Sequence, residues 1–223
     1  MKMCLFVKKV SNFVLDIMFP LNCLGCHARG EVLCDTCVSK IQLAERETSP
    51  DILAVFDYRD LLIKKAIWEL KYRHKRYLGE RLGQLLYEFL IEDISEIKTY
   101  VSGRSIYVIP VPISNTKKKT RGYNQTNAIA RGFCENEKNT ILELRKDIVF
   151  KKIDNLPQAR ITNRKRRLEN VRGVFGIKNP EIVKRRTIIV IDDVTTTGGT
   201  ISEIMKILKS EGAKKVVGFA VVH

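Results

Sequence analysis

The sequence predicts an α/β protein in which a parallel sheet flanked by helices is joined to a small cysteine-rich module near the N-terminus. From Ile52 onward, short apolar runs alternate with segments of helical periodicity, which implies a parallel sheet with right-handed crossovers. Thr187 to Ile191 is a continuous apolar run, typical of a central strand buried on both faces. Two Cys-x-x-Cys pairs lie between residues 21 and 40, ahead of this pattern.

The periodicities predict the order of the elements. Residues 1 to 20 have an amphipathic helical pattern, which favours a packing helix over a membrane anchor. Strands are expected at Ile52–Phe56, Ile106–Val111, Ile148–Lys152, Val174–Ile177, Thr187–Ile191 and Lys215–Val222. Helices are expected at Leu61–Lys71, Leu78–Glu92, Asn124–Glu135 and Thr200–Glu211, the last closed by Gly212. The polar stretch Glu45 to Asp51 reads as a linker, so we expect an N-terminal unit at residues 1–48 and a larger domain at residues 49–223.

The chain is strongly basic, with 40 Lys and Arg against 25 acids and a formal net charge of +15. Such an excess favours a polyanionic partner, although solvated basic faces would give the same composition. The basic residues are clustered along the sequence, which favours a polyanionic partner over solvated faces. The basic clusters are Lys71–Arg76, Lys117–Arg121, Arg164–Arg167 and Lys184–Arg186.

The strongest motif runs from Ile188 to Thr200. Asp192 and Asp193 follow the buried strand, and a turn rich in threonine and glycine then opens a helix. Ligands of open α/β sheets bind at this edge, where backbone N–H groups, hydroxyls and a helix dipole suit a phosphate. The two carboxylates can accept hydrogen bonds from a sugar diol and help to place Mg²⁺, which prefers oxygen ligands. A phosphate, a diol and a metal together describe a phosphorylated ribose.

Two other classes of nucleotide site lack their phosphate loop. An apolar strand followed by two acids also occurs in Walker B motifs, but the sequence has no G-x-x-x-x-G-K-[ST]. It has no G-x-G-x-x-G either, so dinucleotide binding is not supported.

The motif from Ile188 to Thr200 resembles the phosphoribosyl-diphosphate signature of type I phosphoribosyltransferases, with Thr195 in place of the usual apolar residue. Together with the four cysteines, two further blocks resemble the ComF family of competence-associated proteins. The first block is Val108–Pro112 with Arg121–Gln125, and the second is Gln158–Arg167 with Asn170 and Phe175. The resemblance covers Pro20 to Val222. It implies the type I phosphoribosyltransferase fold, Mg²⁺-assisted loss of pyrophosphate to an unidentified acceptor, and a role in DNA uptake.

The resemblance also assigns residues to the site. Asp192 and Asp193 are expected to be catalytic, and phosphoribosyl diphosphate is expected to bind Thr195, Thr196, Thr197, Gly198, Gly199, Thr200, Arg121 and Gly122. Arg121 and Gly122 belong to a second loop at the same sheet edge, where a pyrophosphate needs positive charge, and Lys117 to Lys119 read as a solvated loop. The stretch Ile153 to Arg172 resembles the mobile hood of these transferases, although an open loop with its charges in solvent fits equally well.

The cysteines predict a structural zinc site. Cys23, Cys26, Cys34 and Cys37 supply four thiolates in two knuckles, as tetrahedral Zn²⁺ requires. Disulfides are the alternative and are disfavoured in a reducing cytoplasm. The apolar stretch Phe13–Leu21 is short and interrupted by Asp16, so no export signal is expected and the protein is predicted to be cytoplasmic.

Two classes of function remain open at this point. One is an enzyme that transfers phosphoribosyl groups, and the other is a non-catalytic factor that binds single-stranded DNA and uses phosphoribosyl diphosphate as a regulatory ligand. The residues expected to contact DNA are Lys71, Arg73, Arg164, Arg166 and Arg167. The sequence shows no series of stacking aromatic residues apart from the scattered Tyr72, Tyr77 and Tyr123.

Overall fold

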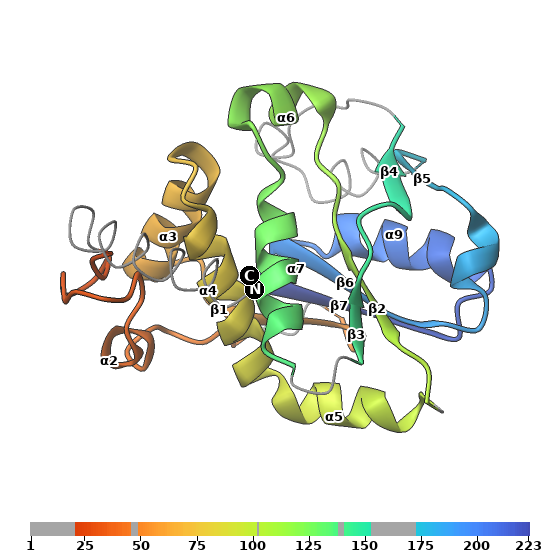
Figure 1. The fold of residues 1–223 in the computed structure, drawn as a ribbon, viewed down its shortest axis with the longest axis horizontal. Coiled ribbons are helices and arrows are strands. Elements are labelled where there is room, and N and C mark those ends of the chain that lie inside the picture. Colours follow the sequence, from red (N-terminus) through yellow and green to blue (C-terminus); the bar gives the residue numbers. More distant parts are fainter. Residues whose placement is uncertain (1–20, 46–48, 102, 138–140, 153–172) are drawn as a thin grey trace, which may run out of the picture. The chain divides into compact units, whose positions relative to one another are not determined.

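The computed structural model describes residues 21–45, 49–101, 103–137, 141–152 and 173–223. The chain divides into two compact units, Met1–Ile41 and Gln42–His223. In the larger unit, five parallel strands form one sheet in the order β1-β7-β6-β2-β3 (Figure 1). The strands are β1 Ile52–Phe56, β2 Ile106–Pro110, β3 Leu142–Leu144, β6 Thr187–Val194 and β7 Lys215–Val222. The predicted class, a parallel sheet flanked by helices, is confirmed.

Strand β6 lies in the middle of the sheet and is longer than predicted. Its pairing with β7 continues through Asp192 and Val194, which lie opposite Ala220 and Val222. The two acids are therefore part of the strand and do not follow it. The backbone hydrogen bonds of a central strand extend it past the end of its apolar run.

Helices cover both faces of this sheet. Helix α9 (Gly199–Ser210) packs against the face that carries Ile188 and Val190, where Ile201 and Ile204 join the core. Helix α7 (Gln125–Glu135) covers the other face, and the ring of Phe133 lies 6.0 Å from that of Phe219. Helix α4 (Arg76–Phe89) packs along α7.

Several elements differ from the prediction. The helix expected at 78–92 ends at Phe89, and a separate helix α5 (Ile91–Thr99) follows after Leu90, with no glycine or proline to mark the break. Lys117 to Lys119 are helical in α6 (Asn115–Arg121), because the Ser114 hydroxyl caps this helix by accepting from the Lys117 N–H at 3.2 Å. Strand β3 has only three residues and was not expected. A 3-10 turn, η2 (Pro180–Val183), precedes β6.

The strands expected at 148–152 and 174–177 do not join the parallel sheet. They are β4 (Val149–Lys151) and β5 (Phe175–Ile177), which are antiparallel and, among the described residues, form a separate two-stranded sheet. The prediction placed them among the alternating elements of a parallel sheet and was wrong about their partner. A short apolar run predicts a strand but contains no information about which strand lies beside it.

Helix α3 (Leu61–Tyr72) agrees with the prediction to within one residue, and Asp60 caps it by accepting from the N–H groups of Leu62 and Ile63. The smaller unit contains the short helix α2 (Asp35–Val38). The amphipathic helix expected at 1–20 lies outside the described residues. Within the described part of the chain, no helix has both the length and the apolar character needed to span a membrane.

Candidate functional site

The topology creates a crevice between the carboxyl ends of β2 and β6. The chain leaves β2 through α6 and α7 toward β3, whereas it leaves β6 through α9 toward β7 on the opposite side. Strand order reverses between these two neighbours, and open α/β sheets bind ligands at such a point. The Val111 N–H donates to the Ile191 carbonyl at 2.8 Å, so the end of β2 lies beside the two acids.

The carboxylates of Asp192 and Asp193 point to opposite faces of the sheet, because successive side chains of a strand alternate. Asp193 reaches the α7 face, where the amide nitrogen of Gln125 donates to its Oδ2 at 3.2 Å. Asp192 lies on the α9 face, opposite Ala220 of the core. Both residues are buried, with 9% and 7% of their surfaces exposed.

Asp193 is held as a carboxylate by cations from other elements. The Lys71 ammonium at the end of α3 lies 3.0 Å from its Oδ2. Burial by itself would raise the pKa of Asp193, but the charge and hydrogen bond of Lys71 lower it, and Gln125 and Arg121 act in the same direction.

Asp192 is in the opposite electrostatic state. Burial raises its pKa well above the usual range, and the neighbouring charge of Asp193 raises it further. The N–H of Asp193 donates to Asp192 Oδ1 at 2.8 Å, which offsets part of this effect. Two adjacent carboxyl groups with diverging pKa values are a common mark of a functional site.

Helix α6 brings two more cations to the acid pair. Burial lowers the pKa of Lys117, and the nearby charge of Arg121 lowers it further, whereas the charges of both acids oppose this shift. The Arg121 guanidinium lies 5.5 Å from the centre of the Tyr72 ring. Lys71 and Lys117 were not assigned to this site from the sequence, because no local pattern shows that α3 and α6 meet β6.

The loop between β2 and α7 is fixed by buried hydrogen bonds. The Thr126 hydroxyl and the Asn124 amide both donate to the Val111 carbonyl, at 2.7 and 3.0 Å. The Tyr123 hydroxyl donates to the Leu70 carbonyl, one residue before Lys71. Gly122 has φ 67°, a left-handed conformation that favours glycine. These contacts set the positions of Arg121 and Lys71 relative to the sheet edge.

The turn after β6 has the features of a phosphate loop. Gly198 has φ 71° and is the N-cap of α9, so it has no side chain to accept from the first turn of the helix. Thr195 is buried, and its hydroxyl accepts from the Gly198 N–H at 3.2 Å, which braces the turn. Thr196 is exposed, and Thr197 and Thr200 are half-buried.

The acid pair also fits a hard cation. Among the described residues, the side-chain oxygen Oε1 of Gln125 is buried without a hydrogen-bond partner, although the amide nitrogen of the same group contacts Asp193. An unpaired buried oxygen beside a carboxylate is a pair of donors that suits Mg²⁺. Asp193 and Gln125, which share the α7 face of the sheet, are therefore the residues that would hold it.

In the smaller unit, the four cysteines converge. The Sγ atoms of Cys23, Cys26, Cys34 and Cys37 all lie within 4.8 Å of one another, and those of Cys26 and Cys34 are 3.6 Å apart. Sulfurs bound to tetrahedral Zn²⁺ at about 2.3 Å lie about 3.8 Å apart, so the cluster is able to hold a metal such as zinc.

The electrostatics of the cluster favour a cation. Hydrogen bonding with the Cys26 and Cys34 thiols raises the pKa of Cys37 to about 12. Burial acts to raise the pKa of Cys23, but backbone hydrogen bonds from Cys34, Cys26 and Gly25 lower it to about 6. Four thiols this close do not all ionise unless a cation compensates their charge.

Comparison with known proteins agrees with the fold of the larger unit. The family model described as the phosphoribosyl transferase domain matches residues 120–223, which include Arg121, the acid pair and the glycine turn. Competence protein F of Haemophilus influenzae is 24% identical over 207 residues, which cover 87% of this chain and 86% of the relative. Competence protein ComFC of Streptococcus pneumoniae is 30% identical over 146 residues, covering 64% of this chain and 56% of the relative. The DNA utilization protein YhgH of Shigella flexneri is 27% identical over 188 residues, which cover 82% of this chain and 74% of the relative.

The chain resembles the ComF family of competence-associated proteins. The type I phosphoribosyltransferase fold is its larger unit, and the four-cysteine cluster lies in the smaller one.

The structure separates the residues that were expected to contact DNA. Lys71 forms an ion pair with Asp193, whereas Arg73 is exposed and its guanidinium lies 5.6 Å from the Trp68 ring centre. Arg164, Arg166 and Arg167 lie outside the described residues, as does the predicted hood at 153–172. The sequence analysis missed Trp68, which stacks with Tyr72 at 5.7 Å, although their spacing of four residues on a helix was a usable signal.

Proposed function

We propose that the larger unit binds 5-phosphoribosyl 1-diphosphate with Mg²⁺ in the crevice between β2 and β6. One observation carries this proposal: Asp192 and Asp193 lie at the carboxyl end of the central strand, at the point where strand order reverses, shortly before a glycine turn that opens α9. The match to the phosphoribosyl transferase domain model over residues 120–223 supports it.

Each part of this ligand has a complementary part of the crevice. The 5′-phosphate would accept hydrogen bonds from the turn Thr196–Thr200 and the N-terminus of α9. The ribose hydroxyls would donate to Asp192 and Asp193, and the pyrophosphate would lie against Lys71, Lys117 and Arg121. When bound, Mg²⁺ would neutralise charge on the pyrophosphate.

The chemistry that such a site supports is phosphoribosyl transfer. The bond between C1 of the ribose and a pyrophosphate oxygen breaks, and a bond from C1 to a nucleophile forms, while the nucleophile gives up its proton. The side chains described above would contribute positioning and electrostatic stabilisation of the departing pyrophosphate, without a covalent intermediate. We propose this activity without naming the acceptor.

Calorimetric titration with phosphoribosyl diphosphate and Mg²⁺ tests the binding site. The double variant Asp192→Asn/Asp193→Asn should bind more weakly by about 2 kcal/mol or more, because charged hydrogen bonds are lost. A control, Glu92→Gln/Glu211→Gln, removes the same charge from exposed positions and should bind like the parent. If the Asp192→Asn/Asp193→Asn variant also binds like the parent, the ligand site is elsewhere.

A second measurement separates an enzyme from a binding protein. Pyrophosphate release is followed in the presence of Mg²⁺, phosphoribosyl diphosphate and a panel of nucleobases and amines. Acceptor-dependent release that the Asp192→Asn/Asp193→Asn variant lacks would establish a transferase. Tight binding without release for any acceptor would favour a regulatory ligand.

A second candidate function, binding of single-stranded DNA, is favoured by an exposed aromatic pair on α3. Trp68 and Tyr72 are 47% and 56% exposed, and their rings lie 5.7 Å apart. Arg73 covers Trp68, and Arg121 covers Tyr72. Aromatic rings with adjacent arginines stack bases without regard to their sequence. The names of the relatives, competence proteins and a DNA utilization protein, support this candidate. Strand binding by a Trp68→Ala variant tests it.

A further inference from the structure

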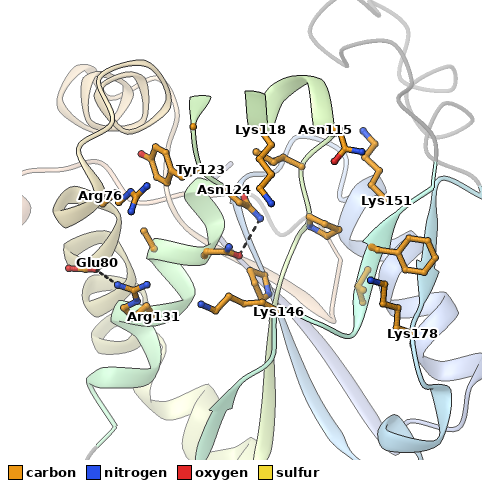
Figure 2. Close-up of a pocket in the computed structure, with 18 residues that line it drawn as sticks. Arg76, Glu80, Asn115, Lys118, Tyr123, Asn124, Arg131, Lys146, Lys151 and Lys178 are labelled. Carbon is orange, nitrogen blue, oxygen red and sulfur yellow. Dashed lines mark hydrogen bonds and ion pairs between the residues drawn. The ribbon is translucent and has the colours of Figure 1, made fainter. Parts of the chain in front are cut away.

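A second polar cavity lies at the same sheet edge but has different walls. Its volume is about 620 Å³, and it extends from the end of β2 and the start of α7 to the β4–β5 pair. Its lining includes none of the residues from Asp192 to Thr200, and of the residues assigned above to phosphoribosyl diphosphate it includes Gly122 alone. Figure 2 shows Arg76 and Arg131 on one side and Lys151 and Lys178 on the other.

The cavity is strongly cationic. Six basic residues line it: Arg76, Lys118, Arg131, Lys146, Lys151 and Lys178. Glu80 is the single acid among the lining residues, and it pairs with Arg131 at 3.3 Å. Positive charge from five separate segments converges on one space, which is costly unless an anion occupies it.

The remaining lining fits an anion that also carries a flat group. The first turn of α7 contributes Asn124 and Asn127, which places the positive end of that helix toward the cavity. Phe150 lines the opposite wall, with the Lys178 ammonium 5.7 Å from its ring centre, and the Arg76 guanidinium lies 5.1 Å from the centre of the Tyr123 ring. A volume of this size exceeds the needs of one phosphate and is typical of sites for small-molecule ligands.

We propose that this cavity binds a chain of two or three phosphoryl groups, free or carried by a nucleoside, independently of the acid-pair crevice. The lysines and arginines would contact the phosphoryl oxygens, and Phe150 would stack with a base if one is present. The proposal does not depend on whether phosphoribosyl diphosphate binds between β2 and β6.

Titration of the full chain with inorganic triphosphate in the absence of Mg²⁺ tests this site. The parent should bind one triphosphate per chain, and Asp192→Asn/Asp193→Asn should bind it equally well. The double variant Lys146→Ala/Lys178→Ala should bind about tenfold more weakly or worse, because two charge-assisted contacts are lost. Both lysines are exposed, so melting temperatures should confirm that the variant folds.

A matched control removes the same charge elsewhere. Arg104→Ala/Lys206→Ala changes two exposed cations that do not line the cavity, and it should bind triphosphate within twofold of the parent. Equal losses in the two double variants would mean that only net charge matters, which would overturn the proposal. Failure of the parent to bind triphosphate at low ionic strength would also overturn it.

Two further titrations identify the ligand and distinguish this cavity from the acid-pair crevice. Adenosine triphosphate that binds more tightly than inorganic triphosphate would identify a nucleotide, and equal affinity would mean that only the phosphate chain is recognised. Phosphoribosyl diphosphate with Mg²⁺ should leave triphosphate binding unchanged. If it displaces triphosphate, or if a short single strand binds the cavity and triphosphate does not, the proposed site is wrong.

Discussion

The Lys71 ammonium lies 3.0 Å from Oδ2 of Asp193, and only 19% and 10% of the two side chains are exposed. This contact joins the last turn of α3 to the central strand of the sheet, 122 positions further along the chain. It neutralises one member of the acid pair, while burial keeps the pKa of the other, Asp192, well above its usual range.

Substitution of Lys71 tests the importance of this ion pair. Lys71→Met should lower the free energy of unfolding by about 1–3 kcal/mol, because Asp193 is left buried without its cation. Lys71→Arg should lose less, and Lys206→Met, on an exposed face of α9, should be neutral. Mg²⁺ should stabilise Lys71→Met more than the parent, since a second cation can replace the ammonium. Urea unfolding with and without Mg²⁺ measures both effects, and equal stability of parent and Lys71→Met would contradict the prediction.

The cysteine cluster predicts one Zn²⁺ per chain. Four thiolates satisfy a closed tetrahedral site, so elemental analysis of protein purified under reducing conditions should find zinc at a ratio of about one. Cys37→Ser should lower this ratio sharply. Cys134→Ser should retain zinc, because Cys134 is not part of the cluster. A zinc content near zero in the parent would contradict the prediction that the four cysteines bind zinc.

Single-stranded DNA should bind with separable stacking and charge contributions. Trp68→Ala should weaken binding by about 1–3 kcal/mol and leave the salt dependence unchanged, because it removes a stacking surface and no charge. Arg73→Ala should reduce the slope of log affinity against log salt by about 0.7, the value for one contacted phosphate. The triple variant Arg164→Ala/Arg166→Ala/Arg167→Ala should reduce the slope further.

Two controls accompany the DNA measurement. Trp68→Phe should keep most of the affinity, and Tyr100→Ala should be neutral, although Tyr100 is also an exposed aromatic residue. A flat salt profile, or no binding at low ionic strength, would exclude this function.

The ion pair between Asp57 and Arg59 predicts a pH-dependent stability. Hydrogen bonds from Arg59 lower the pKa of Asp57 from 3.8 to about 2. Because the pKa is depressed in the folded state, the stabilisation is fully present above about pH 4 and is lost as the pH falls through about 2. Asp57→Asn should therefore have a lower melting temperature than the parent at pH 7, and the difference in melting temperature should become smaller below pH 4. Arg59→Gln removes the side-chain contacts but keeps the backbone N–H bond to Asp57, so it should show a smaller effect in the same direction. A difference from the parent that is independent of pH in both variants would contradict this assignment.

Local patterns predicted most elements of the fold. The run Thr187–Ile191, the alternation from Ile52 onward and the cap residue Asn124 each produced an element close to the expected bounds. The patterns failed at β4 and β5, whose antiparallel pairing depends on a partner in space. They also failed at α6, where the charged segment 117–119 forms a helix once Ser114 caps it.

The sequence by itself determined that two acids and a glycine turn come directly after a buried apolar run, and that four cysteines lie in two Cys-x-x-Cys pairs, because these features are encoded by neighbouring residues. Only the tertiary structure decided which cations face the acids. Lys71 of α3 contacts Asp193, and the charge of Lys117 in α6 acts on both acids, although no periodicity shows that these helices meet the carboxyl edge of β6. The tertiary structure also decided that the two carboxylates lie in different environments. Alternation along β6 separates their side chains, and the packing of α7 and α9 on the two faces gives each carboxyl group a different environment and a different pKa.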